Sequence, residues 1–193
     1  AGVRVGELGA GLGPRSIAPS SGSTRSRRSA RARTTPPGSR RLFWSETNPW
    51  FRKLSEKGWI APGWPREFGG LGLSGARQLI LIEEIERFGA ARFNDQGLLM
   101  LVPLIINYGT QEQKNFFLPR ILSGEHIWAQ CYSEPNAGSD LAALRLEAED
   151  RGDHWVLNGQ KTWITLGTDA NWAFVLARTD KSGRKQEGIS FLL

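Results

Sequence analysis

The spacing between hydrophobic residues changes once along the chain. From Leu42 to about Glu125, apolar residues recur mostly at spacings of three and four, whereas beyond Glu125 apolar and polar residues alternate. The first spacing places side chains on one face of a helix, and the second places them on one face of a strand. The sequence therefore predicts an α+β fold with a helical region over 42–125 and antiparallel strands over 126–193.

Local signals divide the helical region into four helices. Asn48-Pro49 predicts the start of a short helix that ends at Gly58, and residues 59–72 are too rich in proline and glycine to be helical. A second helix is predicted over 75–88. Its apolar stripe is expected to pack inward, and consists of Leu79, Ile82, Ile85 and Phe88.

Two further helices are expected before the change of period. One runs from about Asp95 to Tyr108. The next begins after Thr110, whose side chain can cap the helix while Gln113 reaches back in a capping box. Gly124 is expected to end it.

Strands are expected over 144–149, 154–157, 172–177 and 189–193, after a short strand that begins at Trp128. Turn residues occupy 151–153, and Asn158-Gly159 is the strongest hairpin signal in the chain. Because the sequence ends within the last strand, the resulting sheet would have an open edge. We expect this antiparallel β region to be incomplete at its C-terminus.

Charge is distributed unevenly. The chain has a formal net charge of +6, but residues 1–41 hold nine arginines and only Glu7 as an acid. The rest of the chain is close to neutral, so no nucleic-acid partner is expected for the folded part. Residues 1–41 are predicted to be a disordered basic tail. A cytoplasmic location is expected, with the mitochondrial matrix as the alternative if this Arg- and Ser-rich leader is a transit peptide.

Several kinds of site lack the residues that they need. One cysteine, Cys131, and two isolated histidines offer no metal-ligand spacing. The longest apolar run, over 98–106, is broken by Pro103 and is too short to cross a bilayer. A structural metal and a membrane span are therefore not expected.

The candidate chemistry lies in a loop of small polar residues after the first strand. Gly138 permits close approach of a ligand to the backbone, and Ser133 and Ser139 offer hydroxyl groups. Further along the chain, Trp163 and Thr165 would present an aromatic face and a hydroxyl on the same side of a strand, which suits a flat heteroaromatic ring. Taken alone, these residues are equally consistent with an ordinary turn and a core tryptophan.

A family resemblance goes further than spacing does. Residues 130–140 read QCYSEPNAGSD and resemble the flavin-binding motif of the acyl-CoA dehydrogenase family. Residues 158–165 (NGQKTWIT), 109–114 (GTQEQK) and 118–125 (LPRILSGE) support the match in register, as does the Trp- and Gly-rich stretch over 58–72. The resemblance covers about 48–193 and leaves out the basic tail.

The resemblance implies a helical N-terminal domain, a β-barrel middle domain, and a helical bundle that this chain lacks. It implies FAD as cofactor, an acyl-CoA thioester as substrate, an electron-transfer flavoprotein as acceptor and a homo-oligomer when full length. The residues that would contact FAD are Gln130, Tyr132, Ser133, Gly138, Ser139, Trp163 and Thr165. Ser139 would also approach the acyl-CoA.

By the same resemblance, the catalytic carboxylate would lie in the absent bundle, so the fragment is expected to be inactive alone. Three alternatives remain open: an acyl-CoA oxidase, a flavin monooxygenase of the same fold, and a truncated module that only binds acyl-CoA. Gln130 and Asn136 differ from the residues that many members carry, which leaves the subfamily open.

Overall fold

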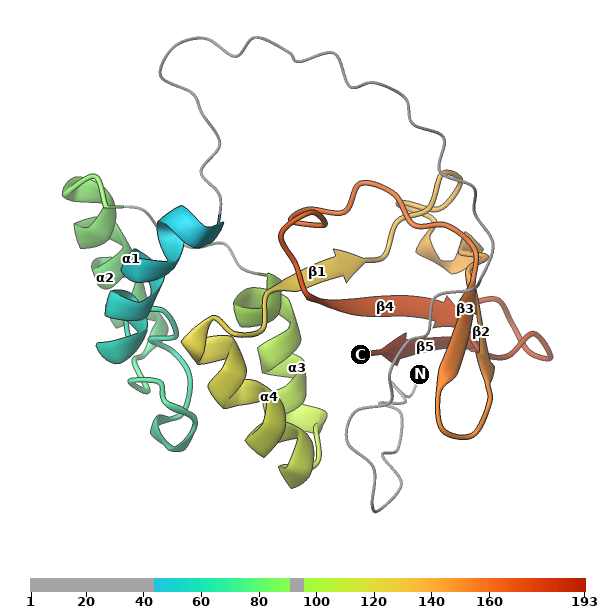
Figure 1. The fold of residues 1–193 in the computed structure, drawn as a ribbon, viewed down its shortest axis with the longest axis horizontal. Coiled ribbons are helices and arrows are strands. Elements are labelled where there is room, and N and C mark those ends of the chain that lie inside the picture. Colours follow the sequence, from blue (N-terminus) through green and yellow to red (C-terminus); the bar gives the residue numbers. More distant parts are fainter. Residues whose placement is uncertain (1–43, 91–95) are drawn as a thin grey trace, which may run out of the picture.

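The computed structural model describes residues 44–90 and 96–193, in which the α-helices precede a single sheet (Figure 1). The predicted disordered tail over 1–41 and the predicted helix start at Asp95 lie outside the described residues. The helical elements are α1 Trp44–Glu56, η1 Arg66–Phe68, α2 Gly75–Arg87, η2 Gly97–Leu101, α3 Val102–Tyr108, α4 Gln111–Ser123 and η3 Leu141–Ala143. The strands are β1 Trp128–Cys131, β2 Glu147–Asp150, β3 Trp155–Asn158, β4 Trp172–Arg178 and β5 Ile189–Leu192.

Helix α1 begins earlier than the sequence predicts. Pro49 lies inside it rather than at its start, which removes one backbone N–H from the early part of the helix. Phe51 and Leu54 follow the proline and are almost completely buried. The free energy gained by burying these two side chains offsets the missing hydrogen bond. Pro49 can therefore lie inside the helix and does not have to be in its first turn.

Helix α4 begins and ends as predicted. The backbone N–H of Gln113 donates to Thr110 Oγ1 at 3.2 Å, and the backbone N–H of Thr110 donates to Gln113 Oε1 at 3.0 Å. Gly124 follows the helix with a left-handed φ of 73°. The capping box and the glycine stop are both confirmed.

Replacing Thr110 with alanine is expected to lower the free energy of unfolding by about 1 kcal/mol, because the first turn of α4 loses an acceptor for one N–H. Urea titration followed by circular dichroism measures the change. Thr168→Ala, the same substitution at an exposed turn residue, serves as the control. An equal effect at both positions would refute the role of the cap.

The inward packing expected for α2 is wrong. Leu79 is 62% exposed and Phe88 is 79% exposed, whereas Ile82 and Ile85 are half-buried. None of the residues of this helix is fully buried. An amphipathic pattern shows that a helix has an apolar face, but the neighbour that would cover this face is not present among the described residues.

The sheet is mixed and open. The open edge agrees with the predicted incomplete β domain, whereas the parallel pairs correct the prediction that all strands are antiparallel. Strand β4 lies at its centre, parallel to β1 and antiparallel to β5. It meets β2 through one parallel bridge, Glu147 to Arg178, and β2 forms an antiparallel hairpin with β3. Alternation of side chains gives the faces of a strand but not its direction or its partners, so the sequence could not reveal the parallel pairs.

The turn predicted at 151–153 joins β2 to β3, with Arg151 N–H donating to the carbonyl oxygen of His154 at 3.0 Å. The hairpin predicted at Asn158-Gly159 is wrong, because the chain leaves the sheet there. Gly159 has a φ of 147°, and a Cβ at this position would lie 2.7 Å from Leu146 Cα. The glycine therefore allows two segments to approach closely rather than forming a hairpin.

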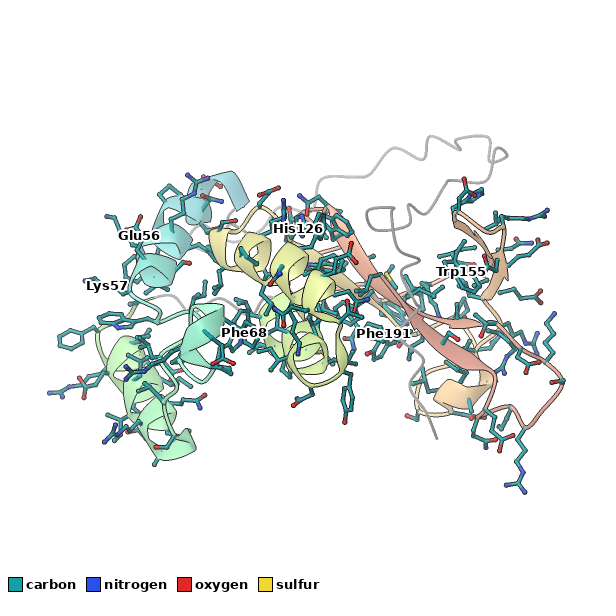
Figure 2. All side chains as sticks on the ribbon, turned by 90° about the horizontal axis from the view of Figure 1, so that it is seen from below. Glu56, Lys57, Phe68, His126, Trp155 and Phe191 are labelled. Atoms are coloured by element: carbon teal, nitrogen blue, oxygen red, sulfur yellow. The ribbon has the colours of Figure 1, made fainter. Side chains whose placement is uncertain are left out.

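The faces of β4 contact two hydrophobic clusters. Trp172, Phe174 and Leu176 belong to the cluster shared with the helices, whereas Val175 and Ala177 belong to a second cluster on the other face. Figure 2 labels Phe191 in the first cluster, toward the helices, and Trp155 beside the second, away from them. The first cluster joins the helices to the sheet and includes Trp128 of β1 and Tyr132, the residue before the loop.

Candidate functional site

The loop over 133–140 begins with a tight turn after β1. Glu134 and Ala137 exchange two backbone hydrogen bonds, of 2.8 and 3.1 Å. Beyond the turn Gly138 and Ser139 are exposed, and a Cβ added at Gly138 would meet no atom within 4 Å. Because the protein itself leaves the space beside Gly138 open, this backbone is accessible to a ligand.

A second segment, over 161–165, runs beside the first. The backbone N–H of Thr162 donates to the carbonyl oxygen of Ser133 at 2.9 Å, and Lys161 Nζ donates to the carbonyl oxygen of Tyr132 at 2.9 Å. These bonds place the stretch around Trp163 next to Ser133, although thirty residues separate the two in the sequence. The segment that carries Trp163 is thus hydrogen-bonded to the start of the loop.

Trp163 does not lie on a strand, which corrects the sequence prediction. Residues 161–164 have no regular structure and Thr165 begins a turn. Trp163 is 89% exposed and has a φ of 57°, and nearby Leu166 has a φ of 62°. Left-handed backbone costs a non-glycine residue on the order of 1–2 kcal/mol. Neither the exposure nor the strain is explained by packing within the described residues, so both favour a ligand-binding role.

Gln130 on β1 and Tyr132 directly after it are half-buried, and alternation places both on the side opposite to Cys131. The ring of Tyr132 packs edge-on against Phe174 with centroids 5.7 Å apart. Burial raises the pKa of the Tyr132 hydroxyl, and a hydrogen bond with the side chain of Gln130 opposes the rise. The two side chains therefore touch each other at the helix-facing side of the strand, as alternation predicts.

Sequence reasoning missed a buried ion pair that joins the loop over 133–140 to the segment over 161–165. Lys161 Nζ lies 3.0 Å from Glu134 Oε1, and the two side chains are only 5% and 8% exposed. Glu134 also accepts the backbone N–H of Arg145 at 2.7 Å and that of Leu146 at 2.8 Å. No spacing in the sequence links a carboxylate in a turn to a lysine 27 residues later, so only the fold reveals the pair.

These contacts determine the ionisation of Glu134. Burial alone would raise its pKa, but the backbone N–H groups of Arg145 and Leu146, together with the Lys161 ammonium, outweigh burial and lower the pKa below the ordinary 4.5. The carboxylate is therefore charged near neutral pH, and its three hydrogen-bond donors and its burial make it a weak and poorly accessible proton acceptor.

The stabilising effect of Glu134 is expected to disappear in acid. Because its folded pKa is lowered, its contribution is complete above pH 4.5 and is lost as the pH falls through the folded value. The difference in unfolding free energy between the wild type and Glu134→Gln should be constant from pH 7 to about 5 and shrink below it. Urea titrations over this range measure it, with the exposed Glu149→Gln as control. A difference that grows toward low pH would contradict the assignment.

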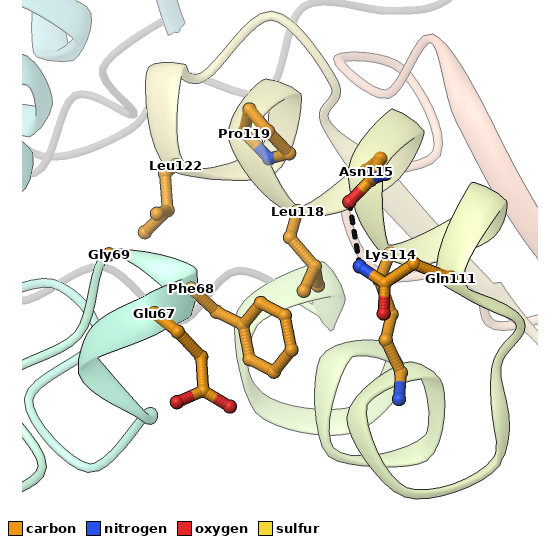
Figure 3. A pocket seen from close by; sticks show the side chains of 9 residues that line it. All are labelled: Glu67, Phe68, Gly69, Gln111, Lys114, Asn115, Leu118, Pro119 and Leu122. Carbon is orange, nitrogen blue, oxygen red and sulfur yellow. Dashed lines mark hydrogen bonds between the residues drawn. The ribbon is translucent and has the colours of Figure 1, made fainter.

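A separate groove of about 530 Å³ lies between η1 and α4 (Figure 3). Phe68, Leu118 and Leu122 give it an apolar wall, and Lys114 lies 5.9 Å from the centre of the Phe68 ring. None of the seven residues predicted to contact a cofactor lines it. The groove and the surface around Ser133 and Trp163 are therefore different places on the molecule.

The described part of the chain is an α+β protein in which a helical unit packs on a mixed sheet and an open loop of small residues follows one strand. Within that part, no helix has the length and apolarity to cross a membrane. The profile of the acyl-CoA dehydrogenase N-terminal domain matches residues 27–125, and the profile of the middle domain matches residues 129–193. The chain belongs to the acyl-CoA dehydrogenase family, a family of oxidoreductase enzymes.

Individual relatives agree with this assignment. Acyl-CoA dehydrogenase IpdE1 of Mycobacterium tuberculosis is 44% identical over 158 residues, which are 81% of this chain and 41% of the relative. Mitochondrial isovaleryl-CoA dehydrogenase of Bos taurus is 40% identical over 142 residues, or 72% of this chain and 32% of the relative. The chain thus spans about a third to two fifths of the length of these relatives.

A solved structure shares the fold. The ChsE4–ChsE5 complex of Mycobacterium tuberculosis aligns with a TM-score of 0.67 and 42% identity, over 75% of this chain and 37% of that chain. The predicted order of a helical region followed by a β region is confirmed, with the sheet mixed instead of antiparallel.

Proposed function

We propose that Gln130, Tyr132, the loop over 133–140 and the segment over 161–165 form the FAD-binding surface of an acyl-CoA dehydrogenase. The observation that carries the proposal is the strained, 89% exposed indole of Trp163 on a segment hydrogen-bonded to Ser133. An exposed aromatic face beside a hydroxyl and an open glycine loop fits a planar ring that bears a phosphate-containing tail. The residues present therefore fit the cofactor that the family uses.

Each predicted residue has a role that agrees with its exposure. Trp163 would flank the isoalloxazine ring, Thr165 would donate a hydrogen bond near N5, and Ser133 would donate near the N1 edge. A donor at the N1 edge stabilises the negative charge that develops there on reduction. Gln130 on β1 and Tyr132 directly after it would line the ring.

The exposed loop suits the charged part of the ligands. Gly138 and Ser139 are both exposed, and their backbone can approach a pyrophosphate without a side chain in the way. Ser139 would also contact the acyl-CoA substrate. When bound, FAD supplies the two-electron acceptor for α,β-dehydrogenation of an acyl-CoA thioester to a trans-2-enoyl-CoA.

The catalytic base is expected in the part of the relatives that this chain does not cover. The reaction needs a carboxylate to remove the α-proton. Glu134 is ruled out because Lys161 and two backbone N–H groups occupy its oxygens. The chain alone is therefore expected to show no dehydrogenase activity. In the complete enzyme, electrons would pass to an electron-transfer flavoprotein, and the enzyme would be a homo-oligomer.

The proposal is tested on two samples: the 193-residue chain, and the same chain joined to the C-terminal part of the IpdE1 relative that the match does not reach. The joined protein is expected to be yellow and to release FAD on acid treatment. Straight-chain and branched acyl-CoA thioesters should bleach it without oxygen. Absence of flavin from both samples would contradict the proposal. Rapid oxygen consumption after bleaching would favour an oxidase or a monooxygenase instead.

A further inference from the structure

Three chain segments meet at one buried carboxylate and one buried ammonium. Glu134 belongs to the turn after β1, and its two oxygens accept the N–H groups of Arg145 and Leu146, at the approach to β2. Lys161 belongs to the segment that carries Trp163, and its ammonium contacts both Glu134 and the carbonyl oxygen of Tyr132. The residues before β2, the loop and the tryptophan segment are thus tied to one point.

We propose that Glu134 and Lys161 are positioning residues that hold Ser133 and Trp163 in a fixed spacing before a ligand binds. The inference rests on the proposed function for the identity of the ligand, FAD. The pair does not itself touch the ligand, because its side chains are 8% and 5% exposed. The pair acts through the backbone groups that it bonds, which are the carbonyl oxygen of Tyr132 and the N–H groups of Arg145 and Leu146.

The connections on each side are short. The ammonium of Lys161 donates a hydrogen bond to the carbonyl oxygen of Tyr132. The next residue in each segment forms a second hydrogen bond, from the N–H of Thr162 to the carbonyl oxygen of Ser133. Trp163 follows Thr162 directly. The hydroxyl of Ser133 and the indole of Trp163 are therefore each within one residue of an anchored backbone atom, which leaves little freedom for one to move relative to the other.

Because the two partners carry opposite charges, replacing both of them can separate the effect of the pair on ligand positioning from its effect on the stability of the protein. Removal of one partner leaves an uncompensated buried charge, whereas replacement of both partners by neutral side chains of similar size often preserves stability. The methionine introduced at position 161, however, cannot donate to the carbonyl oxygen of Tyr132. The glutamine introduced at position 134 has one acceptor oxygen where the carboxylate has two, so it cannot accept the N–H groups of Arg145 and Leu146 on separate oxygens. A double variant should therefore fold well and still hold the ligand poorly.

The test compares Lys161→Met, Glu134→Gln and the double variant Glu134→Gln/Lys161→Met in the 193-residue chain and in the chain joined to the C-terminal part of IpdE1. Lys181→Met is the matched control, because Lys181 forms an exposed ion pair with Glu147. Amide exchange of Thr162, Arg145 and Leu146 is measured by NMR in the chain. FAD affinity is measured by fluorescence in the joined protein, and melting temperature in both.

Lys161→Met is expected to speed exchange at Thr162 by about tenfold, and Glu134→Gln to speed exchange at Arg145 and Leu146 similarly. The double variant should melt near the wild-type temperature but bind FAD about tenfold or more weakly, because the groups around the ring are no longer held in place. Lys181→Met should leave exchange, affinity and melting unchanged.

A double variant with wild-type stability and wild-type FAD affinity would overturn the inference. If the wild-type joined protein bound no FAD, the proposed function would fail separately. The exchange rates would then decide the positioning role, and an unchanged rate at Thr162 in Lys161→Met would reject it. If Lys161→Met did not fold, Glu134→Gln and the double variant would carry the same comparison.

Discussion

Replacing Phe117 with alanine is expected to lower the free energy of unfolding by about 3–5 kcal/mol. Its ring is 2% exposed and lies on α4, where it packs edge-on against Trp128 of β1 at 5.5 Å and Trp172 of β4 at 5.6 Å. The substitution leaves a cavity where the helices meet the sheet, which the surrounding aromatic rings cannot fill without moving. Urea titration followed by circular dichroism measures the loss.

Phe88→Ala is the matched control for this prediction. The same side chain is removed, but Phe88 is 79% exposed at the end of α2. The expected change is within about 0.5 kcal/mol, as is usual for surface positions. Similar losses for the two variants would mean that Phe117 does not join helices to sheet in solution.

Replacing Trp163 with glycine is expected to weaken FAD binding about 30-fold in the chain joined to the C-terminal part of IpdE1, a loss of about 2 kcal/mol of stacking and apolar contact. The free energy of unfolding should stay the same or rise, because glycine adopts the observed φ of 57° without strain. Fluorescence titration with FAD and urea titration measure the two effects on the same variant.

A fall in affinity without a fall in stability distinguishes a ligand-binding tryptophan from a structural one. Trp128→Gly is the contrasting variant, since its indole is fully buried in the cluster between helices and sheet. That substitution should destabilise the protein strongly. A stability loss at Trp163 comparable to that at Trp128 would contradict the binding role.

Signals that act within a few residues were sufficient to predict much of the fold. Thr110, Gln113 and Gly124 define the ends of α4 through bonds to their own helix, and the alternation over 172–177 matches the two buried faces of β4. Partners distant in sequence were not predictable. The parallel pairing of β1 with β4 and the exposure of Phe88 depend on which segments meet, and local patterns carry no information about that.

The candidate site shows the same division. The small residues of the loop indicated an open surface near Ser133 and Gly138, and the family motif linked that loop to Trp163. The sequence placed Trp163 on a strand because alternation cannot report a left-handed backbone at a non-glycine residue. The Glu134–Lys161 pair was missed because burial, not residue type, gives these charges their role.

The most direct test of the account is a structure of the joined protein with FAD bound. The isoalloxazine ring is expected against the Trp163 indole, with the Ser133 hydroxyl at hydrogen-bond distance from the ring and the pyrophosphate beside Gly138 and Ser139. A flavin bound elsewhere, for example in the groove between η1 and α4, with Trp163 and Ser133 free of it, would contradict the account.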